Sequence, residues 1–442
     1  MGDKSTLKLS FINQPWTIAA PPKGSDSTGI WSDQVSNHLN KYVSVVYYGC
    51  EASKSEVKDD HCYLDTNGHS PIEYRAIAAK VKKSRSIPSK IILKLSKVLK
   101  KPYFGSKWFN YDYIWQIAQD VEQSNYTLIH IHNFSQFVPI IRDRAPNTKI
   151  VLHMHCEWVN RLEKFAIAPR LAQTDLILSC SNYITNKIKA RFPEYAENCR
   201  TVNNGVNSDY FVPPEIPQRC QNAPQILFVG RISPEKGIHD LITAFIEVTK
   251  KYPQARLTIA GPHTIVAKEL LFDLQPEPEV QALKPYYSLN YLEYIKSQIP
   301  TNLSPQVFFT NSLAQSELLP FYQNADVVVN PSLSEAFGMS LVEAMATETP
   351  VVATKIGGMT EIIDDGINGL LTEAGEPQQL ADAICSLIAD PNLARRMGKA
   401  GRTKVLQRYC WSKIAESLMD CYADIGVDVR ANVSQKAVAR SL

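Results

Sequence analysis

Short apolar runs alternate along the chain with longer segments in which apolar residues recur at helical spacing. After the first run and the polar loop that follows it, for example, Val35, Leu39 and Tyr42 recur at the spacing of a helix face. Strands that alternate with helices in this way build parallel sheets covered by helices. In the first half of the chain, the predicted strands are Lys8–Asn13, Val43–Tyr48, Tyr126–His132, Lys149–Leu152 and Asp175–Ser179.

A second series of the same kind follows a proline-rich break. Residues Pro213–Pro224 contain four prolines and no apolar periodicity, which is typical of an interdomain linker. A chain of 442 residues is also too long for one ordinary core. We therefore predict a first domain over 1–212, a linker over 213–224 and a second domain over 225–411. The strands predicted in the second half are Gln225–Val229, Arg256–Gly261, Val307–Thr310, Asp326–Asn330 and Pro350–Thr354.

Composition narrows the class of protein. Hydrophobic residues make up 44% and charged residues 21% of the chain, which are globular values. A net charge of only +3 argues against a nucleic-acid binder. The nine scattered cysteines, without a C-x-x-C pair, and the lack of an apolar leader favour a reducing cytoplasm. Because no apolar run is long enough to span a bilayer, we expect a protein that is soluble or rests on a membrane surface.

One segment could make that membrane contact. Residues 80–101 hold nine Lys or Arg and no acid, and within 88–101 a lysine face opposes an apolar face at helical spacing. Trp108, Phe109 and Tyr111 follow and could add interfacial anchors. This pattern is typical of a helix on an anionic membrane. The alternative is a helix whose apolar face packs on the core while its lysines are solvated.

The stretch Asn330–Pro350 combines two carboxylates with a predicted helix start. It begins where an apolar strand ends, carries Glu335 and Gly338 on a polar loop, and places Glu343 in the helix that follows. Open parallel sheets bind ligands at the carboxyl ends of their strands, and helix amino-termini favour phosphate oxygens. Two acceptor carboxylates beside an anion site suit a ligand that is part diphosphate and part polyhydroxyl. The stretch therefore predicts a nucleotide-sugar site.

Three motifs in the second half resemble one known family. Glu335 and Glu343 form E-x7-E with Phe337-Gly338 after the first glutamate, Gly230–Gly237 reads G-R-x-S-x-x-K-G, and Gly357–Glu361 reads G-G-x-x-E. They resemble the retaining GT-B glycosyltransferases, the family that includes sucrose-phosphate synthases and bacterial mannosyltransferases.

This resemblance implies a fold. It is an α/β fold of the GT-B class, with two Rossmann-like domains facing a central cleft. The first domain would bind the acceptor, and the second would hold the nucleotide-sugar donor. The carboxyl-terminal segment 412–442, with the final helix, would pack back on the first domain. No role is predicted for residues 263–306, a connection longer than usual.

The resemblance also implies a role for each side chain in the motifs. Glu335 would lie by the donor sugar, and Glu343 would accept hydrogen bonds from the ribose hydroxyls. Arg231 offers a bidentate fork and Lys236 a point charge to the diphosphate, although a solvated basic turn is the alternative. The predicted catalytic residues are Glu335, His155, Arg231 and Lys236, and the predicted donor-binding residues are Arg231, Lys236, Glu335, Phe337, Gly338, Met339, Glu343 and Gly29.

Two of these residues come from the first half of the chain. Gly29 belongs to the loop Pro21–Trp31, which would close over the donor phosphate or be an ordinary turn between strand and helix. His155 matches the histidine that contacts the donor sugar's hydroxyls, where a neutral imidazole can donate or accept. Zinc binding by His153 and His155 is the rival interpretation, but no third ligand is evident in the sequence.

The implied reaction moves a sugar from a nucleotide-diphosphate sugar, most readily a UDP- or GDP-sugar, to an acceptor hydroxyl with retention of configuration. We expect no cofactor and no metal, because Arg231 and Lys236 can offset the charge of the departing diphosphate and no D-x-D triplet occurs. The acceptor would be a carbohydrate, a lipid-linked group or a small molecule, in the biosynthesis of a glycolipid, polysaccharide or glycoconjugate. The expected location is cytoplasmic, at the inner face of the membrane if 88–101 binds lipid, and no nucleic-acid partner is expected.

Other functions would use a similar site. A GT-B nucleotide-sugar epimerase would need similar carboxylates, and a phosphorylase would need a pyridoxal lysine and a far longer chain. A non-catalytic donor-binding subunit would keep the fold but usually lose Arg231, Lys236 or Glu335. Because the sequence retains all three, transfer is favoured.

Overall fold

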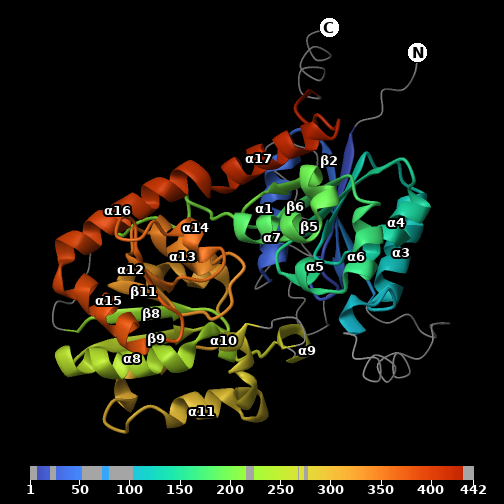
Figure 1. Cartoon of the computed structure of the whole chain (residues 1–442). Coiled ribbons are helices and arrows are strands. Elements are labelled where there is room, and N and C mark those ends of the chain that lie inside the picture. The colour runs from blue at the N-terminus through green and yellow to red at the C-terminus, as the bar shows by residue number, and fades with distance from the viewer. Residues whose placement is uncertain are drawn as a thin grey trace. The chain divides into compact units, whose positions relative to one another are not determined.

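The computed structural model describes residues 7–19, 26–51, 72–78, 103–215, 223–266, 268–272 and 277–431. The chain divides into two compact units (Figure 1). The first comprises Met1–Asn203 with Trp411–Leu442, and the second comprises Asn204–Cys410. The carboxyl-terminal segment thus belongs to the first unit. Residues 88–101, predicted to be an amphipathic helix, lie outside the described residues, as does part of the proline-rich linker.

The first unit is built on a parallel sheet of seven strands in the order β3-β2-β1-β4-β5-β6-β7. Helix α17 belongs to this unit because its apolar face shares a core with α1 and the sheet. The strands are β1 (Lys8–Ile12), β2 (Ser44–Cys50), β3 (Glu73–Ile77), β4 (Leu128–His132), β5 (Lys149–Met154), β6 (Leu176–Ser179) and β7 (Cys199–Thr201). The helices are α1 (Ser27–Leu39), α3 (Tyr111–Glu122), α4 (Phe137–Arg144), α5 (Trp158–Arg161), α6 (Lys164–Leu171), α7 (Asn182–Arg191) and α17 (Trp411–Asp424).

The second unit is built on a parallel sheet of six strands in the order β10-β9-β8-β11-β12-β13. Its main core lies between this sheet and the apolar faces of α8 and α15. The strands are β8 (Gln225–Val229), β9 (Arg256–Ala260), β10 (Val307–Phe309), β11 (Val327–Asn330), β12 (Val351–Thr354) and β13 (Leu370–Thr372). The helices are α8 (Ile238–Lys251), α9 (Lys268–Leu271), α10 (Pro278–Gln281), α11 (Tyr291–Ser297), α12 (Leu319–Asn324), α13 (Met339–Ala346), α14 (Met359–Ile362), α15 (Pro377–Ala389) and α16 (Pro391–Arg408).

The predicted strands are confirmed, each within two residues at either end. One local prediction is wrong. The loop expected to extend to Trp31 ends at Asp26, which caps α1 by accepting hydrogen bonds from the backbone N–H groups of Thr28 and Gly29. An aspartate that accepts from the first turn of a helix stabilises the start of that helix. Gly29 therefore lies in the first turn of α1 and not in the loop that precedes it.

Two further observations bear on the expected surroundings of the protein. The seven cysteines within the described residues carry free thiols. Among the helices that the structure describes, none combines the length and the apolar character needed to cross a bilayer.

Candidate functional site

The loop between β11 and α13 takes its shape from one glycine. Gly338 has a φ of 112°, which L side chains rarely adopt, and a Cβ there would lie 3.2 Å from side-chain atoms of Leu341 and Met359. The residue caps α13 from this conformation, so Met339 becomes the first residue of the helix. Phe337 is buried and packs edge-on against the ring of Tyr409. The backbone of the predicted donor-binding residues 337–339 is therefore held on both sides by core contacts.

A second glycine brings the basic turn against this loop. Gly237 follows the short helix η3 (Pro234–Lys236) with a φ of 65°, and a Cβ at that position would lie 2.0 Å from the backbone oxygen of Pro331. Only glycine tolerates this approach of two backbones. The backbone N–H of Leu333 also donates to the carbonyl oxygen of Glu235 at 2.8 Å. The G-R-x-S-x-x-K-G and E-x7-E motifs are thus joined at the carboxyl edge of the sheet.

Lys236 and Glu335 meet at this junction. The Lys236 Nζ donates to Glu335 Oε2 at 2.6 Å, and both side chains are largely buried. Burial disfavours the charged carboxylate, but Lys236, the backbone N–H of Phe337 and the charge of Arg231 together hold the pKa of Glu335 below its usual value. The site therefore keeps an ionised carboxylate beside an ammonium group that can also face a phosphate.

Arg231 is oriented by a residue that sequence reasoning missed. Its guanidinium Nη2 lies 3.2 Å from Oε1 of Glu235, which is almost fully buried while the arginine remains 43% exposed. Glu235 also accepts hydrogen bonds from the Ser233 hydroxyl and, at 3.3 Å, from the Tyr287 hydroxyl. Glu235 is one of the three positions written x between the arginine and the lysine of the motif, so the motif gave no signal of this role. The guanidinium thus has one fixed partner and an exposed face.

Glu343 is held inside the protein. One carboxylate oxygen accepts from the Tyr322 hydroxyl at 2.6 Å, and the other accepts from Gln315 Nε2 at 2.8 Å. Burial outweighs these two hydrogen bonds and raises the pKa of Glu343. The second unit also holds Arg231, Lys236, Glu335 and the loop around Gly338. All of these residues lie in the segments that directly follow the neighbouring strands β8 and β11.

His155 and Gly29 lie in the first unit. His155 follows β5, is half-buried, and donates its backbone N–H to Asn133 Oδ1 at 2.7 Å. Its ring Nε2 lies 3.0 Å from Nδ1 of His132. The backbone N–H of Gly29 donates to Asp26 Oδ1 at 3.0 Å, so this amide is engaged in the helix cap.

Three buried histidines beneath His155 could be taken for a metal site. One ring nitrogen from each of His130, His132 and His153 lies within 4.8 Å of the others. All three lie on one face of the sheet, because His130 and His132 are two positions apart on β4 and His132 pairs with His153 on β5. This set differs from the predicted pair His153 and His155.

The chemistry of the histidine cluster favours hydrogen bonding. His130 Nδ1 lies 2.7 Å from the Tyr422 hydroxyl, and its Nε2 lies 3.2 Å from His153 Nδ1. Burial lowers the pKa of each ring well below 6.5, so all are neutral at physiological pH. Hydrogen bonds to one another, to Tyr422 and to the Ser32 hydroxyl engage ring nitrogens of all three histidines. We therefore interpret it as a hydrogen-bonded part of the core.

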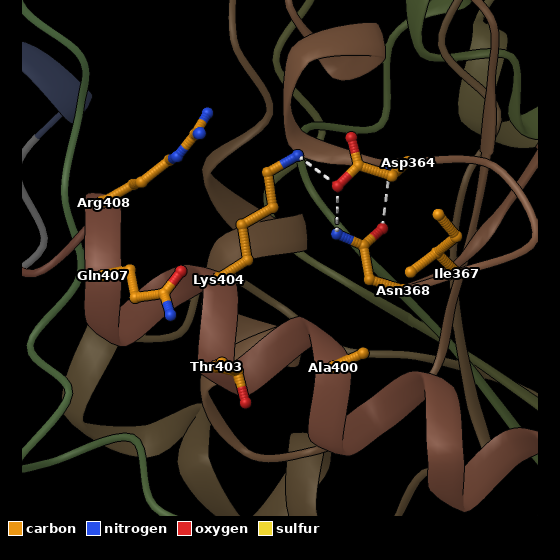
Figure 2. A pocket seen from close by; sticks show the side chains of 8 residues that line it. All are labelled: Asp364, Ile367, Asn368, Ala400, Thr403, Lys404, Gln407 and Arg408. Carbon is orange, nitrogen blue, oxygen red and sulfur yellow. Dashed lines mark hydrogen bonds and ion pairs between the residues drawn. The ribbon is translucent and has the colours of Figure 1, made fainter.

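A surface pocket of about 310 Å³ lies elsewhere on the second unit. Figure 2 shows it between α16 and the turn that carries Asp364 and Asn368. Lys404 Nζ donates to Asp364 Oδ2 at 2.9 Å across this pocket. None of the predicted site residues lines it.

Comparison with solved structures identifies the class of this architecture. A sucrose-phosphate synthase from Thermosynechococcus elongatus matches 95% of this chain and 99% of its own with a TM-score of 0.66 at 21% identity. The Anabaena protein HepE, solved in complex with UDP and glucose, matches 95% of this chain and 100% of its own with a TM-score of 0.66 at 18% identity. The fold is therefore GT-B, with two Rossmann-like α/β domains.

Sequence comparison places the chain in a family. The family model for group 1 glycosyl transferases matches residues 214–404, and the model for glycosyltransferase family 4 matches residues 76–210. A lipopolysaccharide 1,2-N-acetylglucosaminetransferase from Salmonella typhimurium is 28% identical over 420 residues, which cover 92% of this chain and 96% of the relative. Spore coat protein SA from Bacillus subtilis is 25% identical over 325 residues, covering 69% of this chain and 80% of the relative. The chain belongs to the group 1 glycosyltransferases of GT-B fold.

Proposed function

We propose that this glycosyltransferase transfers a sugar from a nucleotide-diphosphate sugar to an acceptor hydroxyl, with retention of anomeric configuration and without a metal ion. The observation that carries the proposal is the Lys236–Glu335 ion pair beside Arg231 at the strand ends of the second unit. Departing diphosphate develops negative charge, and two fixed cations can stabilise it without a metal. HepE has been solved in complex with UDP-glucose, which supports a UDP-sugar as the donor.

The two carboxylates would bind different parts of the donor. Glu335, ionised and next to Lys236, would accept hydrogen bonds from the donor sugar. Glu343 can still take a ribose hydroxyl, because each carboxylate oxygen accepts more than one hydrogen bond, while Tyr322 and Gln315 fix its position. His155 would contact a hydroxyl of the donor sugar. The acceptor is a carbohydrate, a lipid-linked group or a small molecule.

The test is nucleotide release from a panel of UDP-, GDP-, ADP- and TDP-sugars, with EDTA present and without acceptor. We expect slow release from one donor and its loss in the Glu335→Ala variant. The first-formed anomer of the released sugar, followed by proton NMR, should match that of the donor. Inversion would refute retention, and release that depends on added Mg²⁺ or Mn²⁺ would refute the metal-free reaction. Binding of a donor by calorimetry with no release, even with glycan acceptors supplied, would favour the non-catalytic subunit.

A further inference from the structure

One buried arginine of the first unit has only neutral partners. Arg170, on α6, is 9% exposed, and burial lowers its pKa to about 10, so the guanidinium is still charged at neutral pH. Its Nη1 donates to the Ser135 hydroxyl at 3.1 Å, and its Nη2 donates to the carbonyl oxygen of Gly105 at 2.7 Å. Among the described residues, no aspartate or glutamate forms an ion pair with this guanidinium.

Two other arginines of the same unit do have carboxylate partners. Arg161 Nη2 lies 2.9 Å from Glu157 Oε2, and Arg142 Nη2 lies 2.7 Å from Asp175 Oδ2. A buried charge without a counterion costs free energy, because the protein interior solvates it less well than water does. Arg170 therefore carries a cost that a bound anion would offset.

Two further donors beside this guanidinium lack an acceptor. The Ser135 hydroxyl accepts from Arg170, so its own proton points elsewhere, and it meets no acceptor in the part of the chain that the structure describes. The backbone N–H of Gln136, the next residue, likewise has no hydrogen-bond acceptor within the described ranges. Both residues are almost fully buried. Because buried polar groups are generally paired, these donors indicate a position for an acceptor that the protein does not itself supply.

These donors lie at the edge of the sheet where a ligand would bind. Ser135 and Gln136 belong to the loop that follows the carboxyl end of β4, and Gly105 ends the short helix η1 (Tyr103–Gly105). Open parallel sheets bind ligands at this edge. Ser135 and Gly105 fix the plane of the Arg170 guanidinium, while its Nε still reaches solvent. A small anion can therefore approach the guanidinium without displacing the loop.

We propose that the Arg170 guanidinium, the Ser135 hydroxyl and the Gln136 backbone N–H form an anion site that binds a phosphate group. Arginine offers paired N–H groups to phosphate oxygens, and the hydroxyl and the amide add two donors from the neighbouring loop. A terminal phosphate has three oxygens for these donors, whereas a carboxylate has two. That the phosphate is part of the sugar acceptor rests on the proposed function. The anion site itself does not.

The direct test is nitrogen NMR of the full chain labelled with 15N-arginine and titrated with inorganic phosphate. The Nε–H resonance of Arg170 is the one that disappears in Arg170→Lys. We expect it to shift along a saturating curve with phosphate and to stay in place with acetate at equal ionic strength. The donor site has its own arginine, Arg231, so the two sites give separate signals. An Arg170 signal that ignores phosphate, or responds equally to acetate, would overturn the proposal.

Variants test which groups bind the anion. Phosphate stabilisation against heat is measured in a full chain that carries Arg231→Met and Lys236→Ala, which removes the cations of the donor site. Ser135→Ala should raise the phosphate dissociation constant roughly tenfold, and Arg170→Met should raise it further. Arg144→Met, which removes a partly exposed arginine of α4, is the control and should leave the constant unchanged.

Equal phosphate affinity in Ser135→Ala and Arg144→Met would show that the Ser135 hydroxyl is not part of an anion site. Because Ser135→Ala keeps the charge of Arg170, it tests the site even if Arg170→Met does not fold. A purely structural role for these side chains would change the unfolding temperature without phosphate, but not the additional stabilisation that phosphate provides.

Competition identifies the molecule that carries the phosphate. In the same background, tighter displacement of inorganic phosphate by glucose 1-phosphate would indicate a soluble sugar phosphate. Tighter displacement by dihexanoyl phosphatidic acid would indicate a phosphorylated lipid. Displacement by neither would mean that the site binds the free ion only, which would overturn its assignment to the acceptor.

Two outcomes separate this proposal from the proposed function. If phosphate binds at Arg170 but no sugar donor is turned over, the proposed function fails and the anion site stands. If sugar is transferred to a neutral glycan at a rate that neither phosphate nor Arg170→Met alters, the enzyme is a transferase and the acceptor role of the site is wrong.

Discussion

Glu335 remains ionised in a largely buried position because one lysine lies beside it. Removal of either partner leaves the other charge without its counterion, and under the proposed function Lys236 would also offset the charge of the diphosphate. We expect Lys236→Ala and Glu335→Ala each to lower turnover by more than about tenfold. Lys404→Ala is the matched control, because Lys404 forms a similar pair with Asp364 at a separate pocket. Near-normal turnover in either site variant would contradict the assignment.

The same pair predicts a pH dependence. The pKa of Glu335 is lowered in the folded protein, so activity that needs the carboxylate is present at neutral pH and is lost as the pH falls through that lowered pKa. In Lys236→Met, burial would act without the compensating ammonium group and would raise the pKa of Glu335. The acid limb of the kcat/KM profile should therefore move to higher pH. An acid limb at the wild-type position would show that a different group titrates.

Residue types at fixed spacing made the second-unit site predictable, whereas the partners that orient them were not. The motifs that contain Arg231, Lys236, Glu335 and Glu343 can be recognised from residue types and spacing alone, without knowing how these residues pack. Glu235, by contrast, depends on contacts that the sequence does not encode locally: one of its partners, the Tyr287 hydroxyl, comes from a segment 52 residues away.

At the scale of elements, two left-handed glycines provide a stability comparison. Gly237 and Gly375 have φ values of 65° and 75°, but a Cβ meets the Pro331 oxygen at 2.0 Å in the first and nothing within 4 Å in the second. Gly375→Ala should cost about 1–2 kcal/mol of backbone strain. Gly237→Ala should cost more than about 3 kcal/mol, because the backbones of the two motifs must also separate. Urea unfolding of both variants measures the difference between their losses in the free energy of unfolding. Equal losses would show that the backbones at Gly237 and Pro331 move apart at no additional cost.

The long segment between β9 and β10 also contacts the proposed donor site. Its Leu271, Val280 and Leu283 form a small apolar cluster with Leu333 of the motif loop, and its Tyr287 hydroxyl donates to Glu235. Tyr287→Phe should loosen Glu235 and Arg231 and raise the KM for the donor by roughly two- to tenfold, the effect of one hydrogen bond. Tyr294→Phe, in the same segment and without a hydrogen bond to Glu235, is the control. An unchanged KM in Tyr287→Phe would assign the segment a purely structural role.

Element boundaries were predictable where apolar periodicity defines them and not where a cap decides them. The strands were predicted closely because buried parallel strands are continuous apolar runs. Helix α1 begins at Ser27, eight residues before Val35, the first residue of its predicted apolar pattern. Asp26 caps the helix by accepting from Thr28 and Gly29, and residues 27–29 are polar or small. The edge strands β3 and β7 were not predicted, since Glu73 and Arg75 interrupt the apolar pattern of the first and the second has only three residues.

At the scale of the whole molecule, the small net charge conceals a local excess of positive charge. The chain carries only +3 overall, yet 88–101 contains lysines and no acid. Each lysine near an anionic surface contributes about 1 kcal/mol, and this attraction weakens as salt rises. A membrane-bound acceptor would be reached most readily by an enzyme held at that surface. We therefore expect the protein to float with anionic vesicles, not with neutral ones, and less at high salt.

Two matched sets of substitutions distinguish membrane binding through residues 88–101 from a general effect of positive charge. Replacing four lysines within 88–101 by glutamine lowers the charge as much as replacing four exposed lysines elsewhere, but only the first change removes the face that would meet the lipid. The first set is Lys90, Lys94, Lys97 and Lys101, and the second is Lys250, Lys296, Lys399 and Lys413. If both sets abolish flotation equally, attraction is a property of total charge. If wild type does not float with anionic vesicles, the segment serves the fold, and the enzyme takes its acceptor from solution.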